Sequence, residues 1–202
     1  MILIGICGGS GSGKTTLVQA IKEALGDSRV AVISQDSYYK HHSDLSFEDR
    51  CKLNFDHPDA IDYPLFERDL RLLQTGQVAE IPCYSFETHL RTKQTQYVAP
   101  KEIIVVEGIL IFTHQKLFSM FDHTIFIESD ENTRLKRRIA RDTRERGRSR
   151  MEVETRFTET IKPMHDAFIE PHKKKADWVF DNSAHDLSKI QDFCKLILNL
   201  IQ

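Results

Sequence analysis

The string "GGSGSGKT", at residues 8–15, has the spacing G-x-x-x-x-G-K-[ST] of a phosphate-binding loop. Its glycines let successive backbone N–H groups face one anion, and the start of a following helix adds partial positive charge. Lys14 can reach the β and γ phosphates, and Thr15 can offer its hydroxyl to Mg²⁺. A flexible Gly/Ser turn is the alternative, but an apolar strand before it and an amphipathic helix after it favour the loop. We expect nucleotide binding by Gly8, Gly9, Ser10, Gly11, Ser12, Gly13, Lys14, Thr15 and Thr16.

Two acidic residues follow later apolar runs and could act beside this loop. "IIVVEG" places Glu107 at a strand end, where many such enzymes carry a metal-side acid, and Gly108 would let a ligand approach closely. "SQDSYYK" places Asp36 after another strand, which we expect to lie next to the first strand. Asp36 could orient a substrate hydroxyl and accept its proton. We predict a Mg²⁺ site of Thr15, Glu107 and Asp36; the alternatives are a strand-end acid and a turn-forming residue.

Short apolar runs alternate with helical periodicity along the chain. Continuous rather than alternating apolar runs indicate strands that are buried on both faces, as in a parallel sheet. We therefore predict an α/β fold of the P-loop NTPase type, with an open parallel sheet flanked by helices. The predicted strands are 2–7, 30–34, 103–108, 124–129 and 177–182, and the predicted helices are about 14–25, 64–74, 130–146, 151–168 and 186–201.

Residues 35–101 form a far longer connection between two core strands than a simple crossover needs. Because connections of this length are often functional, we predict a substrate-binding insertion. Within it, residues 80–98 are typical of a β-hairpin, with Pro82, Tyr84 and Phe86 on one face by the two-residue strand period. Exposed aromatics offer a stacking platform for a ring. The alternative is an aromatic pair that only covers a sheet edge.

Positive charge is concentrated between residues 134 and 150, where nine Lys/Arg face two acids in a chain whose formal net charge is −2. We predict a lid, at about 138–155, whose arginines hold phosphoryl oxygens. A solvated helix face and a nucleic-acid surface are the alternatives, and the lack of interleaved aromatics disfavours the second. On one helical face we expect Arg134, Arg138 and Arg141, anchored by the apolar pair Leu135 and Ile139.

Composition limits the class of protein. At 202 residues and 40% hydrophobic content, we expect one domain over 1–202. The four cysteines have no C-x-x-C spacing, so we expect reduced thiols rather than a zinc site. Because the sequence shows neither a signal peptide nor an apolar run of about 18 residues, we expect a soluble, cytoplasmic protein with no membrane or nucleic-acid partner.

Six segments together resemble the uridine kinases, the uridine-cytidine kinase family of P-loop kinases. They are "GGSGSGKT", "SQDSYYK", "NFDHPDAID", "IPCYSFETH", "VVEGIL" and "TRLKRRIARDTRERGR", and the likeness extends from about residue 4 to about residue 181. Such a set is far more specific than a P-loop alone, which switches and motors share. The resemblance implies an enzyme that phosphorylates a pyrimidine nucleoside.

The resemblance also assigns the substrate contacts. The loop "NFDHPDAID" would hold the sugar through Asp56, with Phe55 packed nearby, while His57 and Asp59 stabilise the loop. A base pocket would use Tyr84 and His89 at the polar edge of the pyrimidine, Phe86 as an apolar contact, and Tyr39 and Ile109 to close it. Arg141 would reach the sugar, and Arg138, Arg146 and Arg148 the phosphates.

The first hypothesis is therefore transfer of the γ-phosphoryl group of ATP or GTP to the 5′-hydroxyl of uridine and cytidine in pyrimidine salvage. The predicted catalytic residues are Asp36, Lys14, Arg141, Arg146 and Arg148. A homotetramer inhibited by CTP or UTP follows from the resemblance, whereas a phosphoribulokinase-like enzyme and a P-loop switch are the alternatives. Arg156 and Phe157 stand where relatives commonly show Gln-Tyr, which leaves the balance between uridine and cytidine open.

Overall fold

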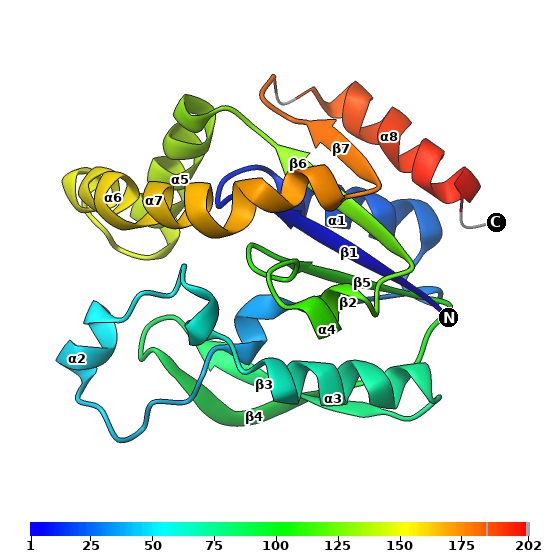
Figure 1. The fold of residues 1–202 in the computed structure, drawn as a ribbon, viewed down its shortest axis with the longest axis horizontal. Helices are drawn as coiled ribbons and strands as arrows, with labels where there is room; N and C mark the ends of the chain where they lie inside the picture. The colour runs from blue at the N-terminus through cyan, green and yellow to red at the C-terminus, as the bar shows by residue number, and fades with distance from the viewer. Residues whose placement is uncertain (185, 201–202) are drawn as a thin grey trace.

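The computed structural model describes residues 1–184 and 186–200, without the side chains of 187 and 197–200. Its centre is a five-stranded, all-parallel sheet in the order β2-β5-β1-β6-β7 (Figure 1). The predicted α/β class and all five predicted core strands are confirmed. The sheet strands are β1 (Ile2–Gly8), β2 (Val30–Ser34), β5 (Ile103–Gly108), β6 (His123–Glu128) and β7 (Trp178–Asp181).

Helices connect these strands, mostly where the periodicity predicted them. The sequence pattern did not predict the short helices α2 and α4. The helices are α1 (Lys14–Leu25), α2 (Phe47–Lys52), α3 (Tyr63–Gln74), α4 (Gln115–Phe118), α5 (Glu131–Glu145), α6 (Arg150–Arg156), α7 (Lys162–Met164) and α8 (Leu187–Leu200). Residue 201 of the predicted last helix lies outside the described residues. No helix in the described part of the chain is both long and apolar enough to cross a membrane.

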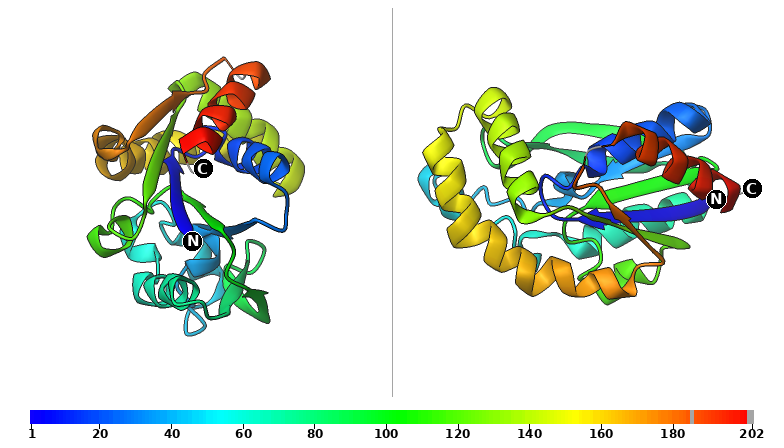
Figure 2. Two further views of the ribbon diagram at one scale, coloured as in Figure 1. Left: turned by 90° about the vertical axis from the view of Figure 1, so that its right-hand side faces the viewer. Right: turned by 90° about the horizontal axis from the view of Figure 1, so that it is seen from above.

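Each face of the sheet has its own core, because successive side chains of a strand point to opposite faces. On β1, Ile4 and Ile6 pack with α1 and α8. Leu3 and Cys7 point to the other face, toward α3 and the insertion. Figure 2 shows α1 and α8 lying together over one face. Burial on both faces explains the continuous apolar runs of these strands.

The strand order corrects one expectation. β2 pairs with β5, and β5 pairs with β1, so the strand that precedes Asp36 is not adjacent to the first strand. Glu107, at the end of β5, lies between the P-loop and Asp36 in the order of strands. Both acids still reach the same edge, since all carboxyl ends of a parallel sheet meet there.

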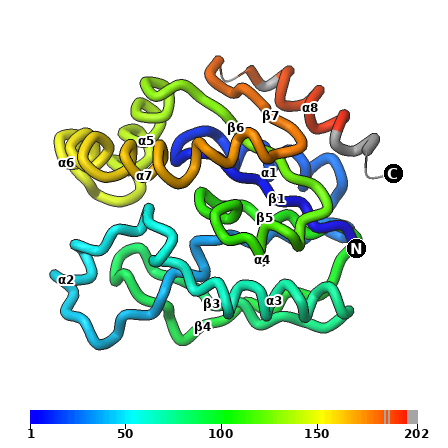
Figure 3. The backbone as a smooth tube through the Cα atoms, viewed as in Figure 1, coloured from blue at the N-terminus to red at the C-terminus, as the bar shows by residue number. Residues whose placement is uncertain are grey.

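The insertion forms a separate layer beneath the sheet (Figure 3). It contains α2, α3 and an antiparallel hairpin of β3 (Ala79–Ser85) and β4 (Leu90–Val98), which confirms the predicted hairpin. The pairing register shifts between Pro82 and Tyr84, and Phe86 lies beyond the end of β3. Pro82, Tyr84 and Phe86 therefore do not follow the regular two-residue period from which a common face was predicted.

The Arg-rich segment departs most from its expected pattern. α5 buries Arg134 and Arg138, while the predicted apolar anchor, Leu135 and Ile139, is only half-buried. That anchor was therefore wrongly placed, because the buried face of α5 meets the P-loop and a polar pocket rather than a hydrophobic core. The helix predicted at 151–168 continues from residue 150 to 175 and includes π-helical turns on both sides of the segment that contains Pro163.

Candidate active site

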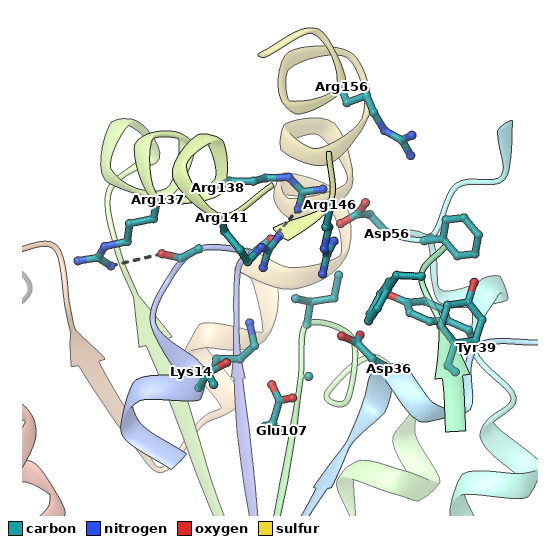
Figure 4. A pocket seen from close by; sticks show the side chains of 18 of the residues that line it. Lys14, Asp36, Tyr39, Asp56, Glu107, Arg137, Arg138, Arg141, Arg146 and Arg156 are labelled. Carbon is teal, nitrogen blue, oxygen red and sulfur yellow. Dashed lines mark hydrogen bonds between the residues drawn. The ribbon is translucent and has the colours of Figure 1, made fainter. Parts of the chain in front are cut away.

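A cavity of about 260 Å³ lies at the carboxyl edge of the sheet, between the P-loop, the insertion and the Arg-rich segment. Figure 4 shows Lys14 and Glu107 at its base, Asp36 and Asp56 toward the insertion, and arginines above them. Three parts of the chain that are far apart in sequence therefore build one site. Its two ends differ in chemistry, because cations and glycines surround one end and aromatic rings the other.

The P-loop supplies the phosphate end. The Lys14 ammonium is buried and donates to the carbonyl oxygens of Gly8 at 2.9 Å and Gly9 at 3.2 Å. Burial lowers the pKa of Lys14, while the nearby Glu107 carboxylate opposes that shift. Gly13 has φ +103°, and a Cβ there would lie 2.1 Å from the Asn182 amide nitrogen, so only glycine fits this turn. The loop is shaped to surround an anion.

Glu107 is the acid nearest the P-loop lysine. The Ser34 hydroxyl donates to its Oε1 at 2.6 Å. Burial raises the pKa of Glu107, Lys14 opposes this shift, and the negative charge of Asp36 adds to it. The carboxylates of Glu107 and Asp36, beside the Thr15 hydroxyl, fit a Mg²⁺ ion that takes its other oxygens from phosphate and water. Among the described residues, no group of three or more acids, histidines and cysteines forms a complete metal cage.

Gly108 was expected to lack a side chain so that a ligand could approach closely, but the nearest group to it is a side chain of the protein. A Cβ at this position would lie 2.4 Å from the Gln35 side chain. Gln35 is fully buried, and its Oε1 accepts the Leu110 amide at 2.6 Å. The close approach at Gly108 is therefore made by a side chain of the protein. This packing fixes the start of the turn that carries Asp36.

Aromatic rings line the end of the cavity that faces the insertion, which we call the acceptor end because a substrate is expected there. Tyr39 lies edge-on to Phe55 at 5.2 Å between centroids, and its ring is 5.0 Å from that of Tyr84. Phe55 stacks on His89 at 4.9 Å. Burial raises the pKa of Tyr39, and the charges of Asp36 and Asp56 add to this effect, so Tyr39 stays neutral. The rings present a preformed apolar surface on which a planar ring can stack.

His89 is held in an unusual position at the tip of the hairpin. It is the one non-glycine residue with positive φ in the described chain, at 53°, and its Nδ1 is buried without a hydrogen-bond partner there. Burial lowers the pKa of His89, and Arg148 and Arg156 lower it further. The imidazole is therefore neutral at pH 7. The backbone of His89 is strained and its ring is neutral. The unpaired Nδ1 can therefore form a hydrogen bond with a ligand.

The loop at residues 54–62 is organised by its own polar residues. The Asp56 amide donates to Asn54 Oδ1 at 3.1 Å, and the Asp59 amide donates to His57 Nδ1 at 3.1 Å. The expected stabilising role of His57 and Asp59 agrees with this contact. Burial raises the pKa of Asp56, while Arg138 lowers it. The Asp56 side chain points into the cavity (Figure 4).

The cavity brings together most of the predicted site residues. Gly8, Gly9, Ser12 and Thr16 do not line it; they form the back of the P-loop. Gly108, which was expected to let a ligand approach, lines it too. Arg137 and Arg156 line it although they were not predicted as site residues, and the unusual residue pair at 156–157 was the available signal for Arg156. The predicted residues that do line it are Ser10, Gly11, Gly13, Lys14, Thr15, Asp36, Tyr39, Phe55, Asp56, Tyr84, Phe86, His89, Glu107, Ile109, Arg138, Arg141, Arg146 and Arg148.

Comparison with known families gives this geometry a context. The model of the phosphoribulokinase / uridine kinase family matches residues 3–188. The chain belongs to that family. A uridine kinase of Lactobacillus johnsonii is 45% identical over 177 residues, which cover 87% of this chain and 84% of the relative. A uridine kinase of Clostridium botulinum strain Okra is 41% identical over 201 residues, covering 100% and 98% of the two chains.

Solved structures support the family fold. A possible uridine kinase from Bacillus stearothermophilus has a TM-score of 0.61 at 21% identity and covers 89% of this chain and 88% of its own. Phosphoribulokinase from Rhodobacter spheroides has a TM-score of 0.64 at 15% identity and covers 89% and 69% of the two chains. At such identities the likeness concerns the fold alone. The family model and the uridine kinase relatives, rather than these structures, confirm the family resemblance noted in the sequence motifs.

Proposed function

We propose that this protein is a uridine kinase, which transfers the γ-phosphoryl group of ATP or GTP to the 5′-hydroxyl of uridine and cytidine. The observation that carries the proposal is the single cavity in which a P-loop, a carboxylate at Asp36 and an aromatic pocket meet. The identity of 41–47% to several uridine kinases supports the choice of acceptor.

In this mechanism the protein chiefly positions the reactants and stabilises charge. Asp36, between the aromatic pocket and Glu107, orients the nucleoside hydroxyl and accepts its proton as the new bond forms. Lys14 and the cavity arginines stabilise the charge on the phosphoryl oxygens. Mg²⁺, held by Thr15 and Glu107 with Asp36 nearby, would neutralise phosphate charge when bound.

The acceptor end suits a nucleoside. Asp56 can accept hydrogen bonds from sugar hydroxyls, and Phe55, Tyr84 and the neutral His89 can hold a pyrimidine ring. A sugar phosphate, the acceptor of the phosphoribulokinase alternative, would leave these rings without a stacking partner. A nucleotide switch would have no use for an acceptor pocket.

The acceptor is tested by ADP release from ATP and Mg²⁺ in parallel reactions with uridine, cytidine, adenosine, ribulose 5-phosphate and no acceptor. We expect strong stimulation by uridine and cytidine alone. Stimulation by ribulose 5-phosphate would favour the alternative kinase, and slow hydrolysis that ignores every acceptor would favour a switch.

Assembly, location and control belong to the same proposal. We infer a cytoplasmic homotetramer that CTP or UTP inhibits, on the basis of the family resemblance. Mass measurement in solution at several protein concentrations tests the tetramer. Uridine titrations with and without CTP test the inhibition.

A further inference from the structure

One carboxylate is enclosed by arginines at the edge of the active site. Asp142, near the end of α5, has 0% exposed surface. Its Oδ1 accepts a hydrogen bond from Arg141 Nε at 2.8 Å and lies 3.7 Å from Arg146 Nε. Its Oδ2 lies 3.3 Å from Arg138 Nε and 3.9 Å from Arg148 Nη1. A single acid therefore contacts four guanidinium groups.

The backbone of Asp142 contributes to the same arrangement. Its carbonyl oxygen accepts the amides of Arg146 and Arg148, each at 3.2 Å. Between these two residues, Gly147 has φ +64°, a left-handed conformation that glycine adopts readily. The turn after α5 is thereby folded back onto Asp142. Asp142 therefore contacts Arg146 and Arg148 through both its backbone and its side chain.

The four arginines face the cavity, but Asp142 does not line it. Arg138, Arg141, Arg146 and Arg148 all line the cavity. Three of them contact Asp142 through Nε, so the contact does not use their Nη groups. Arg138 Nη1 donates to Ser10 of the P-loop at 2.6 Å, whereas the Nη groups of Arg141 and Arg146 make no hydrogen bond within the described chain. These donors are free for phosphate oxygens.

Four like charges in one place repel one another and would spread apart without a counter-ion. Burial alone would raise the pKa of Asp142, but Arg138 and Arg141 lower it below the usual value of an aspartate. The carboxylate is therefore ionised at neutral pH. Arg148 also lies 3.6 Å from Glu152, so the four arginines meet two carboxylates and keep a net positive charge that attracts phosphate.

We propose that Asp142 is a positioning residue, which holds four arginines in the orientation needed by the transferring phosphoryl group. This inference rests on the proposed phosphoryl transfer and adds a residue that touches neither reactant. Preorganised donors stabilise a transition state because they need no reorientation when charge develops. Without Asp142, Arg138 would keep its hydrogen bond to Ser10 and Arg146 its contact with the Phe86 ring, but no group would hold the four guanidinium groups in one arrangement.

The test compares Asp142→Asn with wild type. This change keeps the shape of the side chain and removes its charge. We expect kcat to fall at least tenfold, while the Kd for tripolyphosphate stays equal or becomes up to threefold tighter because the cavity becomes more positive. The KM for uridine should stay within twofold. A merely structural role would instead weaken tripolyphosphate binding together with kcat and the thermal midpoint.

A matched control is Glu154→Gln, which removes an acid that pairs with Arg150 at 2.8 Å; neither residue lines the cavity. It should leave kcat and tripolyphosphate binding unchanged. An unchanged kcat in Asp142→Asn, or a parallel loss of turnover and tripolyphosphate affinity, would overturn the proposal.

A second variant tests the same proposal if Asp142→Asn does not fold. Asp142→Glu keeps the charge but moves it, so we expect reduced kcat with wild-type tripolyphosphate affinity. Full wild-type kcat in Asp142→Glu, or failure of both variants to fold, would also reject the positioning role. If wild type showed no turnover of uridine, the proposed function would fail separately, and slow ATP hydrolysis would then serve as the turnover measurement.

Discussion

The acids of the active site differ in their surroundings although they share one cavity. Glu107 lies beside the P-loop lysine, and burial raises its pKa. Asp56 lies at the acceptor end, where Arg138 offsets the effect of its burial on the pKa. Asp36 stands between them and next to the aromatic ring of Tyr39 (Figure 4). We therefore expect Asp36 to be the acid on which turnover depends most.

Replacement of Asp36 by Asn should leave nucleotide affinity nearly unchanged and lower kcat by a factor on the order of 10² or more. The amide can still orient a hydroxyl, but it cannot accept the proton. Steady-state kinetics and nucleotide binding by calorimetry measure the two effects. Asp44→Asn, an exposed acid of the same insertion, is the control. Near-normal turnover in Asp36→Asn would remove Asp36 from the base role.

Arg156 is one of the two residues at which the sequence was expected to depart from the common family pattern. Its guanidinium lines the acceptor end and forms no ion pair with a residue of the described chain. Its charge lowers the pKa of both Asp56 and His89. We therefore expect Arg156 to donate a hydrogen bond to the acceptor.

Replacement of Arg156 by Ala should raise the KM for uridine about tenfold, which corresponds to about 1.4 kcal/mol for one lost charged hydrogen bond. The KM for ATP should change less than twofold, because Arg156 lies at the far end of the cavity from Lys14 (Figure 4). Arg150→Ala removes an arginine outside the cavity and serves as the control. Equal changes in both KM values would contradict a contact with the acceptor.

At the scale of elements, the long helical stretch at residues 150–175 supports the P-loop from outside. His165 in this stretch and Arg134 in α5 both lie against Gly9, where a Cβ would come within 3.0 Å of either side chain. Burial lowers the pKa of His165 to about 4, and the Arg134 charge contributes to that shift. The packing of one helix on another therefore requires a neutral histidine.

This packing predicts a stability that depends on pH. The ordinary histidine pKa is 6.5 and the folded value is about 4, so between these values the unfolded chain takes up a proton that the folded protein does not. The free energy of unfolding should therefore fall as the pH falls through this range, by about 2 kcal/mol between pH 7 and pH 5.

Urea unfolding of wild type and His165→Phe at pH 7 and pH 5 measures the contribution of this residue. The variant should lose about 2 kcal/mol less than wild type over this interval. His42→Gln replaces a half-exposed histidine and should behave as wild type. The same pH dependence in His165→Phe and wild type would show that another group is responsible.

At the scale of the whole molecule, hydrogen bonds from distant segments fix the conformation of the P-loop. The Asn182 amide donates to the Ser12 carbonyl at 2.8 Å, and Arg137 donates to the Asn182 carbonyl at 2.8 Å. Asn182 follows β7, an edge strand of the sheet, and is buried. One residue thus connects the P-loop, α5 and the far edge of the sheet.

Replacement of Asn182 by Ala should lower the free energy of unfolding by about 0.5–1.5 kcal/mol, because the Ser12 carbonyl would lose the hydrogen bond from Asn182 and keep the one from Arg137. Nucleotide affinity should also fall, since the loop would be less firmly held. Urea unfolding and tripolyphosphate binding measure these effects. Asn132→Ala, on an exposed turn of α5, should change neither. Loss of stability with unchanged binding would show that Asn182 does not shape the loop.

The sequence alone determined the core elements and the chemistry of the phosphate site. Strands buried on both faces must be apolar throughout, and the tight turn of a P-loop needs glycine at fixed positions, so both features are visible as local patterns. The hairpin could also be predicted, because its strands have a local two-residue pattern. Strand order could not, because β5 pairs with β2 about 70 residues away in sequence and with β1 about 100 residues away.

Only the tertiary structure decided how charge is distributed around the site. α5 buries arginines rather than its apolar pair because the surface that it meets is a polar cavity, which no helical period can reveal. The enclosure of Asp142 by four arginines and the place of Arg156 beside Asp56 and His89 depend on the same folding. A sequence pattern reports which side of an element is apolar, whereas the energy of a charge depends on every group that the fold brings near it.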